Sequence, residues 1–369
     1  PMHARGREAE HLHVAGAPEA RSTARLFEAA RDGDADQLQK LLHLKFDPES
    51  QDAMGRRPLH YAAGHGHTRV VDALLSWGDF PADIEAVDAD GSRPLHAAAL
   101  HGRREAVQRL ITRSANPDPR NSHLCTPLHQ AACAGHLDVI RLLVESTADL
   151  LSVDKDGKMP HHHAAHCGHI ATLDLFCLHN KDKLLETKDG RGWTALHGCA
   201  HSGHAALTQW LVGHGAHIPS TDSGRRSPLH LAAQRGHVEV IAALLDGGAR
   251  ADITDCDGHT ALHCAAGAGH AESVLLLLDR GSSSGAAAGG GGAGGHQPVH
   301  HAARSGHEEV VALLLECRAD HGARRDDGVV PLHLAAKGPQ HKDAANLLAD
   351  KTWKRRSEAT AASHFEPIY

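Results

Sequence analysis

The chain has 369 residues, of which 41% are hydrophobic but only 3% aromatic, and its formal net charge is −7. A core with so few aromatic side chains must consist mainly of Leu, Val, Ile and Ala, which favours thin layers of closely packed helices over a bulky globular interior. The negative charge does not favour nucleic acid or an anionic membrane, and the longest strongly apolar run, VLLLL at 274–278, is far shorter than the roughly 20 residues of a membrane span.

The cysteines indicate a reducing compartment. Eight are scattered along the chain, and no two have C-x-x-C spacing. We therefore expect a cytoplasmic protein, with the nucleus as an alternative. No signal peptide is visible, but the chain begins with Pro1, which leaves open a processed chain or a fragment.

The N-terminal part divides into two segments. Residues 1–21 are rich in Arg, Glu, His, Ala and Gly without an apolar period, and we predict that they are disordered. Residues 24–43, ARLFEAARDGDADQLQKLLH, have helical apolar spacing and predict a helix pair that caps the N-terminal end of the folded region.

A motif then recurs through the rest of the chain. RPLHYAAGHGH at 57–67 is followed by related runs that begin at 93, 126, 159, 194, 227, 260, 297 and 330. The anchoring histidines are separated by 36, 33, 33, 35, 33, 33, 37 and 33 residues; they are His60, His96, His129, His162, His197, His230, His263, His300 and His333. A fixed period of this length is typical of a repeat array.

These runs resemble the ankyrin repeat, whose period is 33 residues and whose motif is T-P-L-H-x-A. The resemblance implies an all-α fold, an ankyrin-repeat solenoid of about ten helix-turn-helix repeats with β-hairpin-like fingers. We assign the array to residues 22–350. It also implies that the histidines of the Leu-His and Gly-His positions form hydrogen bonds that hold helix starts and connect adjacent repeats.

Each unit has local features that suit this fold. We expect the Ser or Thr before Pro to cap the first helix by accepting backbone N–H bonds, and Pro suits the first helical turn. The Gly-His pair ends that helix, because Gly tolerates a left-handed turn. A second helix comes next, as in 237–248, and then a polar finger with a D-x-D-G turn, as in 249–260. One unit buries too few aliphatic side chains to fold alone, so the units must stack.

The run MPHHHAAHCGH at 159–169 has five histidines and a cysteine, but we predict no metal site there. Consecutive histidines on a helix point about 100° apart. His162 and His166 share a face, yet the Glu of an H-E-x-x-H motif is replaced by His163. His161 replaces the Leu of Pro-Leu-His, so either a hydrogen bond accommodates its ring or this repeat is loosened. In vitro binding of nickel or zinc by this run stays an open alternative.

The segment at 281–295, GSSSGAAAGGGGAGG, matches a hydrolase and a dinucleotide pattern only formally, because no strand precedes it and no α/β unit surrounds it. We interpret it as a flexible low-complexity insertion in a finger. We therefore expect no enzymatic activity, no catalytic residue and no cofactor. Residues 351–369 form a polar tail whose Lys354-Arg355-Arg356 cluster is either a solvated charge run or a localisation signal.

We predict that the chain is a monomeric scaffold or adaptor that binds a partner protein on the concave ankyrin surface, with no nucleic acid and no membrane as partner. The binding residues should be those that vary between repeats, after the Ala-Ala pair and at the end of each finger. The candidates are Arg56, Leu100, His101, Leu124, Lys158, His166, Trp193, His201, Arg226, Gln234, Arg235, His259 and Arg304.

Trp193 is the leading candidate, because exposed Trp and Arg are enriched among binding hot spots. One alternative is that the chain is the ankyrin fragment of a larger regulatory protein with a kinase, ubiquitin ligase or channel domain. Another is a metal- or pH-responsive protein. If the nine motif histidines are held neutral, their stabilisation should be lost as the pH falls.

Overall fold

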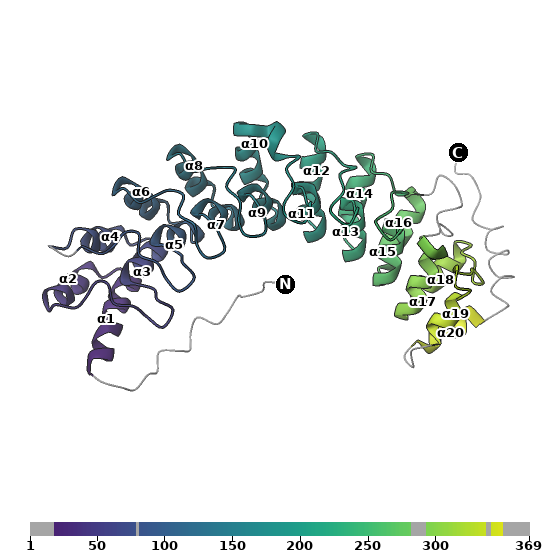
Figure 1. Ribbon diagram of the computed structural model, residues 1–369, viewed down its shortest axis with the longest axis horizontal. Coiled ribbons are helices and arrows are strands. Elements are labelled where there is room, and N and C mark those ends of the chain that lie inside the picture. Colours follow the sequence, from purple (N-terminus) through teal and green to yellow (C-terminus); the bar gives the residue numbers. More distant parts are fainter. Residues whose placement is uncertain (1–17, 79–80, 282–292, 337–340, 350–369) are drawn as a thin grey trace. The chain divides into compact units, whose positions relative to one another are not determined.

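The computed structural model describes residues 18–78, 81–281, 293–336 and 341–349. Within these residues the chain is helical and contains no β-strand. It divides into two compact units, Pro1–Lys155 (unit 1) and Asp156–Tyr369 (unit 2). Each unit is built from helix pairs joined by polar fingers (Figure 1).

In the described residues, unit 1 consists of four helix pairs. In chain order these are α1 (Pro18–Asp32) with α2 (Ala35–His43), α3 (Pro58–His65) with α4 (Thr68–Leu75), α5 (Pro94–Leu100) with α6 (Arg104–Thr112), and α7 (Pro127–Ala134) with α8 (Leu137–Glu145).

The described part of unit 2 consists of six helix pairs and one short 3₁₀ turn. They are α9 (Pro160–Cys167) with α10 (Ile170–Leu184), α11 (Ala195–Ser202) with α12 (Ala205–Gly213), α13 (Pro228–Arg235) with α14 (Val238–Asp246), α15 (Ala261–Ala268) with α16 (Ala271–Gly281), then η1 (Ala293–Gly295), α17 (Pro298–Ser305) with α18 (Glu308–Glu316), and α19 (Pro331–Ala335) with α20 (Lys342–Ala349).

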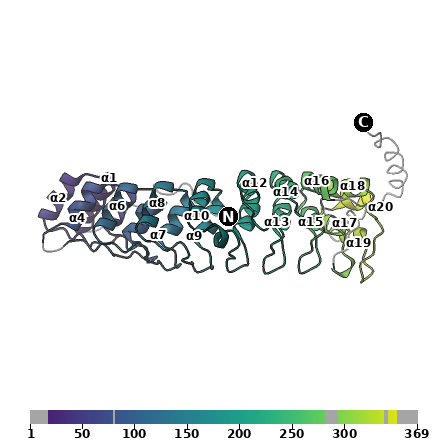
Figure 2. The same ribbon diagram turned by 90° about the horizontal axis from the view of Figure 1, so that it is seen from above.

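The pairs stack in register within each unit. In unit 1 the first helices α3, α5 and α7 contact one another in succession, and so do the second helices α4, α6 and α8. In unit 2 the first helices of the pairs form one row: α9, α11, α13, α15, α17 and α19. The second helices form another row: α12, α14, α16, α18 and α20. Figure 2 shows the fingers that precede α11, α13 and α15 projecting to one side of the stacked helices of unit 2. This arrangement confirms the predicted ankyrin-type stacking.

The core is aliphatic, as the composition predicts. In the pair α13 and α14, the side chains of Ala232, Ala233, Val240, Ile241 and Leu244 have no exposed surface. The alanines allow neighbouring first helices to approach closely, and the branched side chains of the second helix fill the space between the two rows. Burying each Val, Ile or Leu contributes about 1.5–3 kcal/mol.

The boundaries differ from the sequence predictions at one place. Helix α1 begins at Pro18, so residues 18–21 are helical rather than disordered. The segment PEAR begins with a proline, which is favoured in a first helical turn, and continues with good helix formers. The sequence prediction missed this helical turn because it relied on an apolar period, which these residues lack. Residues 1–17, most of the insertion at 281–295 and the tail at 351–369 lie outside the described residues, and the predictions for them remain predictions.

Candidate functional site

The histidines of the Pro-Leu-His motif hold the start of each first helix. In every one of the nine motifs, the backbone N–H of the residue before the helix lies within hydrogen-bond distance of the imidazole Nδ1, as for Arg57 and His60 (3.1 Å) or Thr194 and His197 (3.2 Å). A backbone N–H can only donate, so Nδ1 accepts and the proton sits on Nε2.

The opposite nitrogen bonds to a neighbouring repeat. His197 Nε2 lies 3.1 Å from the carbonyl oxygen of Arg226, and His230 Nε2 lies 2.9 Å from that of His259. The same bond joins His60 to Ser92, His96 to Cys125, His162 to Thr187 and His263 to His296. A carbonyl only accepts, which agrees with the Nε2–H tautomer. We call the nine motif histidines the frame histidines.

Burial favours the neutral form of the buried frame histidines. It lowers the pKa of His96, His197 and His263 to about 4, only partly opposed by the backbone hydrogen bond that each ring makes. The pKa values of His60 and His230 are lowered for the same reason. An additional proton on Nδ1 would also meet the backbone N–H that already points at it, so protonation breaks the helix start.

The predicted hydroxyl caps are wrong in their geometry. The hydroxyls of Thr126, Thr194, Ser227 and Thr260 do not accept a backbone N–H bond from the helix. Each lies instead 2.8–2.9 Å from Nδ1 of its frame histidine. The imidazole, three residues into the helix, takes over the role that Glu has in a capping box, and the hydroxyl is drawn to it.

The histidines of the Gly-His turns connect each repeat to the preceding one. His237 Nε2 lies 3.1 Å from the carbonyl oxygen of His201, and equivalent bonds join His67, His136, His204, His270 and His307 to carbonyls 36–40 residues earlier. The ring of His237 also covers Gly203, where a Cβ would lie 2.7 Å from the imidazole. Gly203 has φ of 85°, so both its conformation and this contact require glycine.

The run at 159–169 separates into different roles. His162 is a frame histidine, and His166 is exposed on the helix surface. His161 is buried, with 1% of its surface exposed, and its Nε2 lies 2.9 Å from the hydroxyl of Thr187. A hydrogen bond therefore accommodates the histidine that replaces Leu, which was one of the two expected outcomes.

The predicted binding residues of unit 1 lie on finger ends and at the end of α5. Arg56 pairs with Asp52 (Nε to Oδ2, 2.9 Å) and lies 4.7 Å from the ring centre of Tyr61. Leu100 and Leu124 each expose 42% of their surface, and His101 is exposed.

Leu124 occupies a different finger position from the other candidates, because Cys125 stands between it and Thr126. It takes the place at which Gly91 lies in the preceding finger, and its φ is 57°. A leucine in this left-handed conformation is unusual, since its side chain carries a steric penalty that glycine does not.

In unit 2 the expected exposure of Trp193 is wrong. Its side chain is buried, with only 8% of its surface exposed. The indole Nε1 donates to Asp222 Oδ2 in the next finger at 3.1 Å, and its ring lies 4.9 Å from that of His201. The next finger, 29 residues on, covers this tryptophan, a contact that the local sequence does not reveal.

His201 connects several candidates across three repeats. Its Nε2 lies 3.0 Å from Nη2 of Arg235, and its ring stacks 6.3 Å from that of His166. Burial and the Arg235 charge lower the pKa of His201 to about 4, so the neutral ring accepts from the guanidinium. We call His166, Arg191, Trp193, His201 and Arg235 the Trp193 cluster.

The other candidates of unit 2 lie in different surroundings. Arg226 is half-buried and pairs with Asp222 at 2.8 Å, and Lys158 lies 3.7 Å from Asp156. Gln234 and Arg304 are exposed on their first helices. His259 lies away from this cluster, beside His296 and His301.

Two residues of the site were not predicted. Arg191 is exposed, and its guanidinium lies 5.7 Å from the Trp193 ring centre. Asp222 is buried and accepts from both Trp193 and Arg226, which lowers its pKa despite burial. The repeated Asp at the start of each finger turn was a signal for Asp222, whereas Arg191 lies at a variable finger position.

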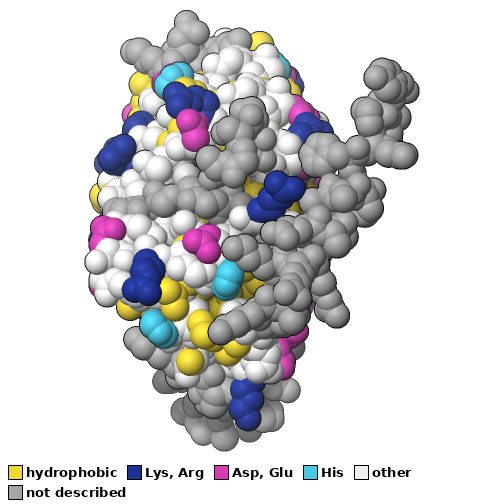
Figure 3. All heavy atoms as spheres, turned by 90° about the vertical axis from the view of Figure 1, so that its right-hand side faces the viewer, with side chains coloured by type: hydrophobic (Ala, Val, Ile, Leu, Met, Phe, Trp, Pro, Cys, Tyr) yellow, Lys and Arg dark blue, Asp and Glu magenta, His cyan; other side chains and the backbone are white. Residues whose placement is uncertain are grey.

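Neither sign of charge predominates on the face of the molecule drawn in Figure 3. On the face drawn in Figure 3, acidic and basic side chains of the described residues are interspersed. No described helix is long and apolar enough to cross a membrane.

The stacked helix pairs, the frame histidines and the fingers define a repeat protein that presents its variable residues on finger ends and first helices. Six overlapping segments match the family described as Ankyrin repeats (3 copies), at residues 26–121, 78–154, 103–186, 128–222, 209–288 and 284–357. The chain belongs to the ankyrin repeat family, whose members are generally protein–protein interaction modules and typically non-enzymatic. A search of curated proteins gave no match.

Proposed function

We propose that unit 2 binds a partner protein through the Trp193 cluster. The observation that supports this is the contact of non-frame residues from three successive repeats: His166, His201 and Arg235 lie on α9, α11 and α13 and touch in sequence. The frame histidines account for the fold, so these additional side chains are not needed to start or connect the helices.

The chemistry of the cluster favours a partner segment with carboxylates beside an apolar side chain. Arg191 and Arg235 are exposed and carry full positive charges, while His201 is neutral. Arginine binds carboxylates with two parallel hydrogen bonds, and it is enriched among binding hot spots. Trp193, held by Asp222, supports the surface from below instead of projecting into the partner.

The test compares partner capture by the full chain and two double variants. We expect Arg191→Ala with Arg235→Ala to lose the partner or weaken binding by about 30–900-fold, because each hot-spot arginine contributes about 1–2 kcal/mol. The control is Arg141→Ala with Arg280→Ala, which removes the same charge from the second helices α8 and α16.

A partner that is retained equally by both double variants would contradict the proposal and move the binding site elsewhere. Binding through the cluster should also weaken as salt is raised, since surface charges are screened.

We further propose that the chain acts as a scaffold or adaptor in the cytoplasm. The eight cysteines are scattered along the chain and no two have C-x-x-C spacing, which supports a reducing compartment. Cell fractionation followed by detection of the endogenous chain tests this, and recovery in a secreted fraction would contradict it.

A further inference from the structure

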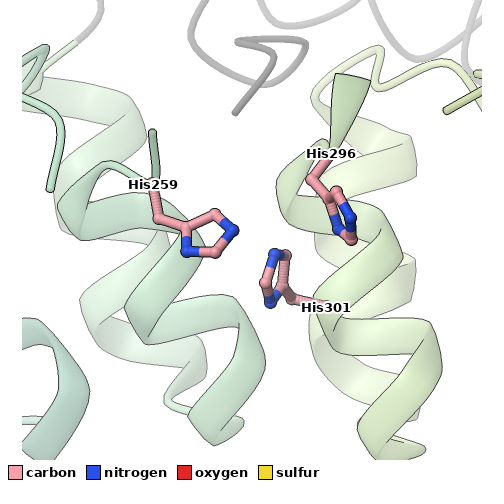
Figure 4. Close-up of side chains that lie close together, drawn as sticks. All are labelled: His259, His296 and His301. Carbon is pink, nitrogen blue, oxygen red and sulfur yellow. The ribbon is translucent and has the colours of Figure 1, made fainter. Parts of the chain in front are cut away.

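Three histidines of unit 2 converge between two adjacent repeats. His259 ends the finger before α15, His296 directly precedes Gln297 and α17, and His301 lies in the first turn of α17. Figure 4 shows the three imidazoles turned toward one another across the space between the two helices. One nitrogen of each ring lies within 4.8 Å of the other two.

The repeat architecture brings these residues together. His259 and His296 occupy the same position in successive repeats, directly before the residue that caps the first helix. The frame bond from His263 Nε2 to the His296 carbonyl oxygen, 2.9 Å long, fixes the backbone of His296 beside α15. His301 follows the frame histidine of its own repeat, and its ring contacts the rings of His259 and His263 in the preceding repeat.

Two of the three imidazoles have lowered pKa values. Burial, together with His259, His263 and His296, lowers the pKa of His301 to about 3. Burial and Arg325 lower the pKa of His296.

One nitrogen of the site has no hydrogen-bond partner. His301 Nε2 is buried without one. Burying a polar atom in this way is unfavourable unless something compensates it. The contacts of this ring with His259 (4.6 Å between centres) and His263 (5.6 Å) are edge-on packing and supply no such partner.

A carboxylate lies beside one of the rings. Asp255 Oδ2 lies 3.8 Å from His259 Nδ1, which leaves Nε2 of this ring for an ion. Carboxylates beside the second ring nitrogen orient metal-binding histidines and raise their basicity. Asp255 Oδ1 is already occupied, because it accepts from the backbone N–H groups of Asp257 and His259.

We propose that His259, His296 and His301 bind a divalent transition-metal ion of the zinc type, with a fourth position left for water or a partner's side chain. Three imidazoles with one open position are an established zinc-ligand set. Zinc–nitrogen bonds of about 2.0–2.1 Å place tetrahedral ligand nitrogens about 3.3–3.4 Å apart, so the rings must converge by up to about 1.5 Å.

The ion would cross-link two repeats. It joins the finger before α15 to the start of α17, on either side of the longest step between frame histidines, the 37 residues from His263 to His300. Zinc should therefore stabilise this junction in particular, since an ion that binds only the folded state stabilises it.

The test is a zinc titration of the tag-free full chain after removal of metal with a chelator, with a chromogenic chelator as competitor. We expect one site that is at least about 100-fold weaker in His301→Gln and in His296→Gln, because losing a direct ligand exceeds the 10–100-fold effect of losing an outer-shell partner. The control variant, His217→Gln with His321→Gln, removes two exposed finger histidines and should bind like the unaltered chain.

Two further readouts keep the proposal testable if a variant unfolds. Cobalt(II) in place of zinc should give the intense visible absorption of tetrahedral coordination. In the unaltered chain, zinc should protect His259 and His296 from diethyl pyrocarbonate, mapped by mass spectrometry. Equal zinc affinity in the variants and the control, or no protection of these two histidines, would overturn the proposal and indicate adventitious binding by surface histidines.

Discussion

The most informative perturbation of the fold is the removal of an interior frame histidine, for which we choose His197→Ala. His197 is fully buried, accepts from the Thr194 backbone N–H at 3.2 Å, and donates to the Arg226 carbonyl oxygen at 3.1 Å. Alanine leaves the Thr194 N–H without a partner, whereas the Arg226 carbonyl oxygen keeps its bond from the Asp222 N–H at 2.9 Å. A buried polar group without a partner costs about 1–3 kcal/mol and the loss of one further hydrogen bond about 0.5–1.5 kcal/mol, so the variant should lose about 1.5–4.5 kcal/mol of stability.

The last motif supplies a matched control. His333 has the same position in its repeat but is exposed, and its Nδ1 lies 3.5 Å from the Val330 nitrogen. His333→Ala should therefore stay within about 0.5 kcal/mol of the unaltered chain, as surface substitutions usually do. The assay is urea unfolding followed by circular dichroism. Equal losses in the two variants would refute the reasoning, because the bonds to the next repeat would then contribute nothing.

Three other expectations concern the histidines and one finger residue. The pKa of His96, His197 and His263 is about 4 in the folded chain, below the unfolded value of about 6.5. The stabilisation by these histidines is therefore complete above pH 6.5 and is lost as the pH falls toward 4. A melting temperature that does not fall between pH 7.5 and pH 5.0 would contradict this. Leu124→Gly should raise stability by up to about 1 kcal/mol by relieving the left-handed φ of 57°, whereas Leu124→Ala should not, and thermal melts of the pair distinguish the two. His161→Leu should leave the free energy of unfolding unchanged or raise it by about 1 kcal/mol, because Thr187 keeps its bond to the Leu184 carbonyl oxygen at 3.0 Å. A loss of more than about 2 kcal/mol of unfolding free energy in urea would show that the histidine is required.

The sequence predicted the repeated elements well because their determinants are local. Pro at the first helical turn, the Ala-Ala pair and the Gly-His turn each act within a few residues, and α3, α7 and α13 begin and end where these signals stand. The role of the frame histidines also came from the sequence, but through the family resemblance rather than through spacing.

The features that were missed depend on neighbouring repeats. Trp193 is buried because Asp222, 29 residues on, accepts its indole N–H. The convergence of His259, His296 and His301 likewise arises only when two repeats stack. Local patterns carry no information about which variable residue will meet which partner one period away.

The hydroxyl caps failed for a related reason. A Ser or Thr before a helix is ordinarily expected to accept backbone N–H bonds. Here the imidazole at the third helical position competes for that role, and Thr194 bonds to His197 Nδ1 instead, at 2.9 Å. A prediction made from the cap residue alone does not include this competition.

The central claim is that the motif histidines form a neutral, hydrogen-bonded frame, which leaves the variable residues available for binding. Its most direct test is nitrogen-15 NMR of histidine-labelled chain at pH 5.5, where an unperturbed imidazole is mostly protonated. We predict that the buried frame histidines appear as neutral Nε2–H tautomers with Nδ1 unprotonated. Imidazolium signals for the buried frame histidines, or Nδ1–H tautomers, would contradict the account.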